Sequence, residues 1–131
     1  MLTIGKVAER VGLRPSAIRF YESRGMLRPT LRGPHGYRLY SEDVIKLLLF
    51  VKRAQSLGIT LKEIKPLLHL ASQGERPCIH VKRLARNHLR ETENKIRELR
   101  VLRDELRTIL RRKPGRPHGD QVCPIIQPDR D

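Results

Sequence analysis

Two short helical patterns joined by a glycine, followed by a basic glycine-rich segment, constrain the fold of the first forty residues. Apolar residues recur at helical spacing after Thr3, an N-cap residue type, and Gly12 ends this first helix in a turn. Pro15 suits the first turn of a second helix, where its missing N–H needs no partner. Residues 28–40 predict a turn leading into a strand. This order is typical of a winged helix-turn-helix that reads duplex DNA.

The charge of the chain indicates a polyanionic partner. Its 131 residues include 28 Lys and Arg against 14 Asp and Glu, a net charge of +14. Residues 1–75 and residues 76–131 each carry +7, so the excess is not confined to a tail. Nucleic acid and an acidic membrane surface are the two partners that such a charge suits.

Hydropathy and cysteine content favour a cytoplasmic protein without a membrane partner. No apolar run approaches the roughly 20 residues that a bilayer-spanning helix needs, and the N-terminus lacks a secretory signal pattern. The two cysteines, Cys78 and Cys123, are 45 positions apart and form no disulfide framework. A reducing compartment keeps them as thiols.

A long charged helix is predicted after two shorter ones. Ser41 and Thr60 each begin a helix, and Glu63 completes a capping box with Thr60. From Cys78 to about Arg112 the sequence has neither glycine nor proline. Apolar residues there, the later ones three and four apart, are Val81, Leu84, Ile96, Leu99, Leu102, Leu106 and Ile109. A helix of about 30 residues is ~45 Å long, and a domain this small cannot bury its apolar stripe. We expect a two-fold dimer, the alternative being a solvated helix on a monomer.

The candidate DNA contacts lie on the second helix and on the basic hairpin. A recognition helix meets the major groove near its N-terminal end, and Arg and Tyr on a wing reach phosphates or the minor groove. The candidates are Arg14, Ser16, Arg19, Tyr21, Arg32, Tyr37 and Arg38. Core packing is the alternative for Tyr21 and for Tyr40. Most of these contacts position the duplex, so sequence specificity rests partly on DNA deformability.

The chain resembles the MerR family of bacterial transcription regulators over about residues 1–126. The motifs that carry the resemblance are Arg19-Phe20-Tyr21-Glu22, Gly25-Met26-Leu27, Arg32, Gly36-Tyr37-Arg38-Leu39-Tyr40, Gly58-Ile59-Thr60-Leu61 and Cys123-Pro124-Ile125-Ile126. The resemblance implies an antiparallel coiled-coil homodimer on a palindromic operator, within a promoter whose spacer is too long. Effector binding makes the dimer distort that spacer so that RNA polymerase can use the promoter, and the effector-free dimer represses.

The resemblance extends to the metal-sensing branch of this family. Cys78 resembles the cysteine of divalent-ion sensors, where copper-type sensors have serine, and the spacing of His118 and Cys123 resembles that of zinc-responsive members. In an antiparallel dimer, Cys78 and Cys123 of different chains can meet. Soft thiolates suit zinc, cadmium, lead or mercury. The chain departs from the branch at Lys113 and Pro114, where members usually carry one or two cysteines.

The sequence therefore predicts metal ligands at Cys78, His118 and Cys123, with His80 and then His88 as further candidates. The predicted fold is mainly α. Its parts are a winged helix-turn-helix DNA-binding domain with a helical extension (1–75), an antiparallel coiled-coil dimerisation helix (76–112), and an effector-binding loop with the tail (113–131).

Several other functions compete with metal sensing. A thiol-based redox or electrophile sensor of the same fold is the main alternative, followed by a sensor of an organic effector. An enzyme is not expected, because no Ser/His/Asp set, paired carboxylates or phosphate-binding glycine loop occurs. A small metal chaperone would use the cysteines but would not need Arg19 or the basic hairpin. A chromatin-like coat protein would bind DNA without preferring a palindrome.

Overall fold

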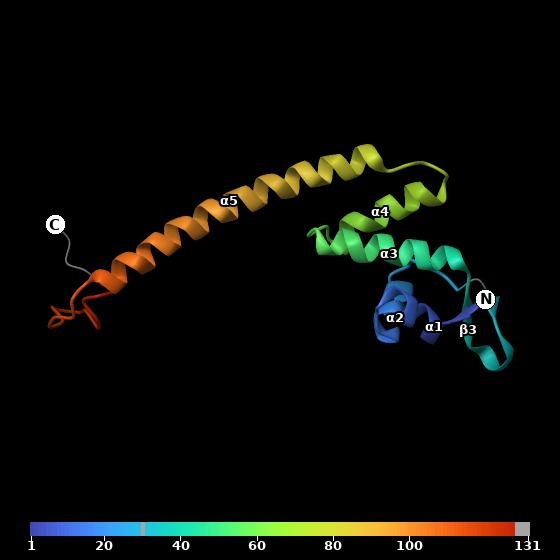
Figure 1. Ribbon diagram of the computed structural model, residues 1–131, viewed down its shortest axis with the longest axis horizontal. Coiled ribbons are helices and arrows are strands. Elements are labelled where there is room, and N and C mark those ends of the chain that lie inside the picture. Colours follow the sequence, from blue (N-terminus) through green and yellow to red (C-terminus); the bar gives the residue numbers. More distant parts are fainter. Residues whose placement is uncertain (30, 128–131) are drawn as a thin grey trace. The chain divides into compact units, whose positions relative to one another are not determined.

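The computed structural model describes residues 1–29 and 31–127, which fall into two compact units, Met1–His88 and the part that begins at Leu89. The elements in chain order are β1 (Leu2–Thr3), α1 (Ile4–Val11), α2 (Pro15–Ser23), β2 (Leu31–Arg32), a 3-10 turn (Pro34–Gly36), β3 (Arg38–Tyr40), α3 (Glu42–Ser56), α4 (Leu61–Ser72) and α5 (Cys78–Arg111) (Figure 1). The mainly α fold expected from the sequence is confirmed.

Local signals set the ends of α1 and α2 as the sequence predicts. The Thr3 hydroxyl oxygen accepts a hydrogen bond from the Lys6 backbone N–H, with 3.3 Å between the heavy atoms. Gly12 ends α1 with a φ of 77°, in the left-handed region that glycine enters without a Cβ clash. Pro15 is the first residue of α2. The helix-turn-helix therefore follows from residues within a few positions of each helix end.

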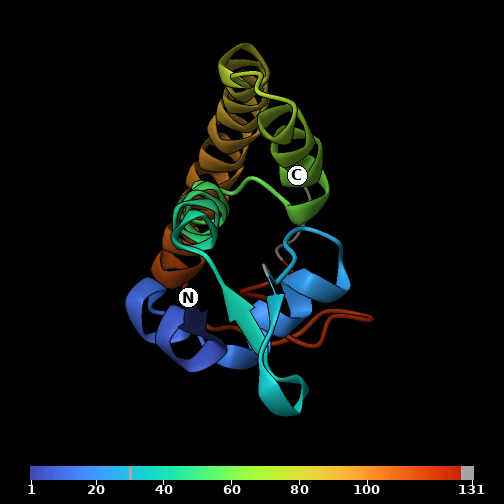
Figure 2. The ribbon, with the colours of Figure 1, turned by 90° about the vertical axis from the view of Figure 1, so that its right-hand side faces the viewer.

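Strand β3 is the centre of a small antiparallel sheet with the order β1-β3-β2. Its pairings are Leu2 with Tyr40, Thr3 with Leu39, Leu31 with Leu39, and Arg32 with Arg38. The hairpin of β2 and β3, drawn in cyan, ends in a tip that projects from the sheet (Figure 2). Strand β1 was not predicted, because two residues are too few to show the alternation that identifies a strand.

Helices α3 and α4 begin where the sequence predicts. Glu42 and Asp43 occupy the first turn of α3, where carboxylates face the positive end of the helix dipole. A capping box begins α4, with 3.2 Å between Glu63 N and the Thr60 hydroxyl and 3.0 Å between Thr60 N and Glu63 Oε1. Pro66 lies inside α4.

The core of the first unit joins the helix-turn-helix to α3, α4 and β3. Its most completely buried side chains are Val7, Ile18, Tyr40, Leu48, Val51 and Ile64. Leu84, near the start of α5, packs against this core. His88 contacts Glu63, with 2.9 Å between His88 Nε2 and Glu63 Oε1. Through these two contacts the first part of α5 packs against the unit that ends at His88.

Helix α5 is a single helix of 34 residues without one buried side chain. The predicted stripe is exposed in the second unit: Ile96 is 42% exposed, Leu99 62%, Leu102 48% and Leu106 51%. Within the described residues, no helix combines the length and the apolar character needed to cross a membrane.

Candidate DNA interface and thiol sites

Helix α2 exposes three of the predicted DNA contacts around its N-terminal end. Arg14 is the N-cap residue, and Ser16 and Arg19 lie in the first two turns. All three side chains are exposed. Guanidinium and hydroxyl donors at this end of a recognition helix can meet phosphates and base edges.

Tyr21 is a core residue in the structure. It is 7% exposed, and its hydroxyl donates to Gln55 Oε1 over 2.8 Å, which joins α2 to α3. Burial raises the pKa of this hydroxyl. The geometry agrees with the core-packing interpretation of Tyr21 and not with the predicted DNA contact, so we leave Tyr21 out of the contacts proposed below.

Phe20 is the exposed aromatic residue of α2, and the sequence interpretation did not select it. It is 42% exposed, and the Arg24 guanidinium carbon lies 5.1 Å from the centroid of its ring, within cation–π distance. The adjacent aromatic pair in the sequence gave no sign of which member faces inward, because that choice depends on α3.

The hairpin tip is held by contacts within itself. Arg32 Nη1 donates to the Gly36 carbonyl oxygen over 3.1 Å, and Gly33 N donates to the Tyr37 carbonyl oxygen over 2.8 Å. A Cβ at Gly33 would lie 2.7 Å from two atoms of the Tyr37 ring, so the ring needs a glycine there. Tyr37 is 48% exposed. The tip therefore presents Arg32 and Tyr37 from a fixed backbone.

Glu22 links α2 to the central strand of the sheet. One of its oxygens accepts a hydrogen bond from the Tyr40 hydroxyl, and the other lies 3.2 Å from Arg38 Nε. The pKa of Tyr40 is raised far above its usual value, chiefly by burial and next by the hydrogen bond to this carboxylate. Sequence reasoning selected Arg38 but not Glu22, because an acid within a basic motif carries no signal for DNA.

The first thiol, Cys78, is the exposed first residue of α5. His80 is also exposed, and it lines an apolar groove of about 380 Å³ beside Leu67 and Leu84. His88 contacts Glu63, so the least favoured of the predicted histidine ligands has a structural partner.

The second thiol, Cys123, is half-buried in a turn that is tied to its surroundings. Gln127 N donates to the Cys123 carbonyl oxygen over 2.9 Å, and Gln127 Oε1 accepts from Val122 N over 2.7 Å. Arg112 Nη1, just after α5, donates to the Ile125 carbonyl oxygen over 2.6 Å. The loop therefore holds Cys123 in a formed turn next to the end of the helix.

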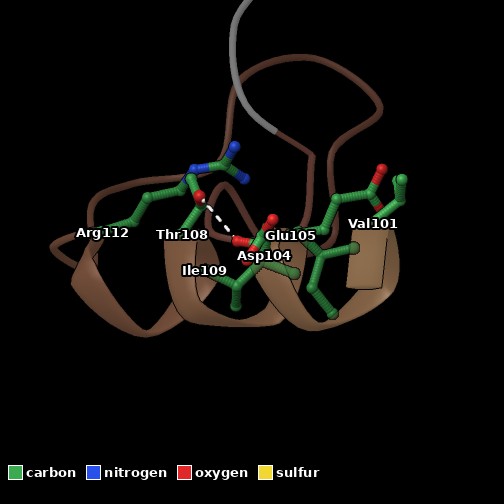
Figure 3. Close-up of a pocket in the computed structure, with 7 residues that line it drawn as sticks. Val101, Asp104, Glu105, Thr108, Ile109 and Arg112 are labelled. Atoms are coloured by element: carbon green, nitrogen blue, oxygen red, sulfur yellow. Dashed lines mark hydrogen bonds between the residues drawn. The ribbon is translucent and has the colours of Figure 1, made fainter. Parts of the chain in front are cut away.

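A groove of about 500 Å³ lies along the last turns of α5 beside this turn (Figure 3). Its lining is Val101, Asp104, Glu105, Thr108, Ile109, Arg112 and Ile126. The Thr108 hydroxyl donates to the Asp104 carbonyl oxygen over 2.9 Å, so this hydroxyl bonds to its own helix. Arg112 both lines the groove and binds the turn of Cys123.

The predicted metal ligands do not form a site within one chain. Among residues 1–29 and 31–127, no group of three or more His, Cys, Asp or Glu is placed to hold a metal ion. His118 is exposed, and its backbone N–H donates to Gln121 Oε1 over 2.9 Å. Two thiols and an imidazole nevertheless form a donor set that fits soft divalent ions.

The helix-turn-helix with its adjoining hairpin defines a DNA-binding protein of the regulator class. Residues 2–70 match the family described as MerR HTH family regulatory protein, and residues 45–109 match the one described as MerR, DNA binding. The chain therefore belongs to the MerR family, whose members are transcription regulators and not enzymes.

Three similar proteins add to this membership. The chain is 37% identical to heavy metal-dependent transcription regulator 1 of Rhizobium meliloti, over 96% of this chain and 85% of the relative. It is 33% identical to PbrR691 of Ralstonia metallidurans CH34, whose crystal structure is a complex with lead(II), with a TM-score of 0.77 over 97% of this chain and 98% of the other. HiNmlR, a MerR family regulator bound to promoter DNA, is 26% identical with a TM-score of 0.57 over 83% of each chain. The first two support the resemblance to the metal-sensing branch.

Proposed function

We propose that the protein is a dimeric, metal-responsive transcription regulator. It binds promoter DNA and represses, and with a thiophilic divalent ion (zinc, cadmium, lead or mercury) it activates by distorting the promoter spacer for RNA polymerase. Its place of action is the cytoplasm, without a membrane partner. The observation that carries the proposal is the position of the thiols. Cys78 begins α5 within the unit that carries the helix-turn-helix, and Cys123 lies in a turn bound to Arg112 just after that helix.

The proposed dimer follows from the length and surface of α5. A continuous helix of 34 residues is about 50 Å long, so its two ends cannot share an ion. The exposed stripe that includes Leu99, Leu102 and Leu106 needs a partner to cover it. A second, antiparallel copy would cover the stripe and would place the first turn of one helix beside the last turn of the other.

The proposed metal site is shared between the two subunits of that dimer. Cys78 of one subunit would meet His118 and Cys123 of the other. Two thiolates and one imidazole can hold a trigonal site, or a tetrahedral site completed by water. Lys113 and Pro114 add no thiol at the start of the loop. Coordination by these three residues would tie the start of α5, next to the DNA-binding unit, to the loop of the partner.

The proposed DNA contacts are the exposed donors of α2 and the hairpin. Arg14, Ser16 and Arg19 would enter the major groove, while Arg32, Tyr37 and Arg38 would bind phosphates or the minor groove. HiNmlR, the similar MerR family regulator bound to promoter DNA, supports DNA binding by this fold.

Metal titration tests the sensing part of the proposal. Reduced protein is titrated with zinc, cadmium, lead, mercury and copper(I), recording bound metal per dimer and the ultraviolet absorbance of thiolate–metal bonds. We expect saturable binding of at least one divalent ion, lost in Cys78→Ser and in Cys123→Ser. His69→Ala is the control, because His69 is an exposed histidine on α4 outside the proposed site. Equal binding by both cysteine variants would exclude the thiols.

Transcription in vitro tests the regulatory part. A duplex selected by the protein from a random pool serves as the operator. Cys123→Ser should bind this duplex with nearly unchanged affinity but fail to activate transcription when metal is added. Cys78 is exposed and accessible to oxidants, so a peroxide-treated sample is included. A response to peroxide without a response to any metal would favour the redox alternative.

A further inference from the structure

The carboxylate of Glu22 is withdrawn from water inside a basic DNA-binding unit. Its side chain is 11% exposed, although α2 is the helix proposed to enter the major groove. Both of its partners, Arg38 and Tyr40, are on β3 and are two residues apart, so they project from the same face of the strand. A single carboxylate therefore joins the recognition helix to the hairpin.

The two partners of Glu22 differ in exposure. The Tyr40 ring is fully buried, so its hydroxyl group holds one carboxylate oxygen from inside the core. The Arg38 side chain is 36% exposed and meets the other oxygen through Nε, at 3.2 Å. A carboxylate withdrawn from water needs donors around it to offset the lost hydration. The carboxylate thus has one oxygen on a buried partner and the other on the more exposed Arg38.

The ion pair restrains the Arg38 guanidinium, because its Nε atom lies 3.2 Å from a Glu22 oxygen. The guanidinium is planar, so this restraint on Nε also limits where Nη1 and Nη2 can lie. A planar fork of N–H groups matches the oxygens of a phosphate and gains from being fixed in advance. The same ion pair joins β3 to α2 and thereby limits how far the hairpin can turn relative to the recognition helix.

We propose that Glu22 is a positioning residue for DNA binding, which orients Arg38 toward a phosphate and couples the hairpin to the recognition helix. The inference rests on the proposed DNA-binding function and on the assignment of Arg38 to a phosphate. It assigns an attractive role to an acidic residue that lies next to a polyanion.

Charge repulsion alone predicts the opposite change in DNA affinity, so the sign of the change distinguishes the two roles of Glu22. If Glu22 acts on DNA only through its negative charge, Glu22→Gln strengthens binding by removing a repulsion. If Glu22 acts through Arg38, the same change weakens binding, because the guanidinium loses the anion that orients it. Glutamine has the size of glutamate and keeps an oxygen that can accept the Tyr40 hydrogen bond.

The experiment measures binding of the full-length protein to the selected duplex at a series of salt concentrations. Glu22→Gln should bind roughly fivefold more weakly. It should also lower the salt slope, which is the change of log binding constant with log salt concentration, by up to about the amount that one phosphate contact contributes. Arg38→Met should show the same reduced slope, and the double variant should be no weaker than Arg38→Met alone. Glu9→Gln is the matched control, because Glu9 is exposed on α1 and lies 3.8 Å from Lys6. It should bind as tightly as the wild type or slightly more tightly.

A second variant separates positioning from folding. Tyr40→Phe removes the buried hydroxyl but keeps the ion pair with Arg38, so it should reduce stability in urea and leave the salt slope unchanged. Tighter or unchanged binding by Glu22→Gln overturns the inference. Weaker binding by Glu22→Gln also overturns the inference if its salt slope equals that of the wild type and its effect on the binding free energy adds to that of Arg38→Met. If Arg38→Met binds like the wild type, its phosphate role fails while the regulator proposal stands. If the wild type selects no duplex, the proposed function itself fails.

Discussion

The Glu63 carboxylate joins α4 to α5. Replacing Glu63 should separate the contributions that its individual contacts make to folding stability. Its Oε1 atom lies 3.0 Å from both Thr60 N and the Thr60 hydroxyl, and 2.9 Å from His88 Nε2. Glu63→Ala removes all three contacts, whereas Glu63→Gln keeps an oxygen that can accept from Thr60 N. The two variants therefore lose different parts of the same interaction.

The expected magnitudes follow from these contacts. Loss of half of a capping box costs about 0.5–1 kcal/mol, and loss of the partly buried hydrogen bond with His88 costs about 1 kcal/mol. Glu63→Ala should thus lower the free energy of unfolding by about 1–2 kcal/mol. Glu63→Gln should lower it by about half as much, because the charge and the His88 contact are affected while the cap is kept.

The loss of stability in Glu63→Gln should depend on pH. The pKa of Glu63 is lowered from 4.5, chiefly by the hydrogen bond from Thr60 N–H and next by His88. The unfolded chain therefore takes up this proton at higher pH than the folded protein does. The stability contributed by the charge is present above the unfolded-state pKa and is lost as the pH falls through the lowered folded-state pKa. The difference between wild type and Glu63→Gln should be complete above about pH 5 and shrink below about pH 4.

Urea unfolding followed by circular dichroism measures both effects. It is carried out at one protein concentration, since the proposed dimerisation would change the apparent stability. Glu9→Gln serves again as the exposed control and should change little. Equal stability of Glu63→Ala and the control would refute the contribution assigned to the cap and His88. A wild-type advantage over Glu63→Gln that persists unchanged to low pH would refute the assignment of the acid dependence to this carboxyl.

Three further changes test the core, a turn and the proposed dimer. Leu48→Ala, at a fully buried site on α3, should lower the free energy of unfolding by about 3 kcal/mol in urea, and a loss below about 1 kcal/mol would contradict its place in the core. Gly12→Ala should cost about 1 kcal/mol or more, because φ is 77° and a Cβ would lie 2.9 Å from Lys52 Nζ; unchanged unfolding would speak against this turn. Leu102→Glu, in the exposed stripe, should give monomers in analytical ultracentrifugation, while Arg97→Glu on the opposite face of α5 should not. A Leu102→Glu dimer would exclude this stripe as the interface.

The sequence predicted the parts of the fold that depend on neighbouring residues. Thr3, Pro15 and the pair of Thr60 and Glu63 mark helix starts in both the sequence and the structure. A cap needs only partners within one helical turn, so the sequence contains the whole signal. The short strand β1 was missed, because it exists only by pairing with β3, across more than thirty residues of sequence.

The candidate sites were predicted by residue type but not by environment. Cys78 and Cys123 were found because thiols are rare and chemically distinct, yet nothing local indicated that Gln127 and Arg112 would hold the second thiol in a turn. The same limit applies to α2, where the sequence named Arg19 and Tyr21 as DNA contacts and left core packing open for Tyr21. The structure exposes the first and buries the second.

The sequence by itself determined the ends of the helices, the basic charge, the apolar stripe of α5 and the family, since each depends on composition or on short spacings. Only the tertiary structure decided that Tyr21 faces Gln55 and that Glu22 faces Tyr40, contacts that span 34 and 18 residues of the chain. Such pairs form where separate helices and strands pack against one another. Their geometry is therefore absent from any local pattern of residues.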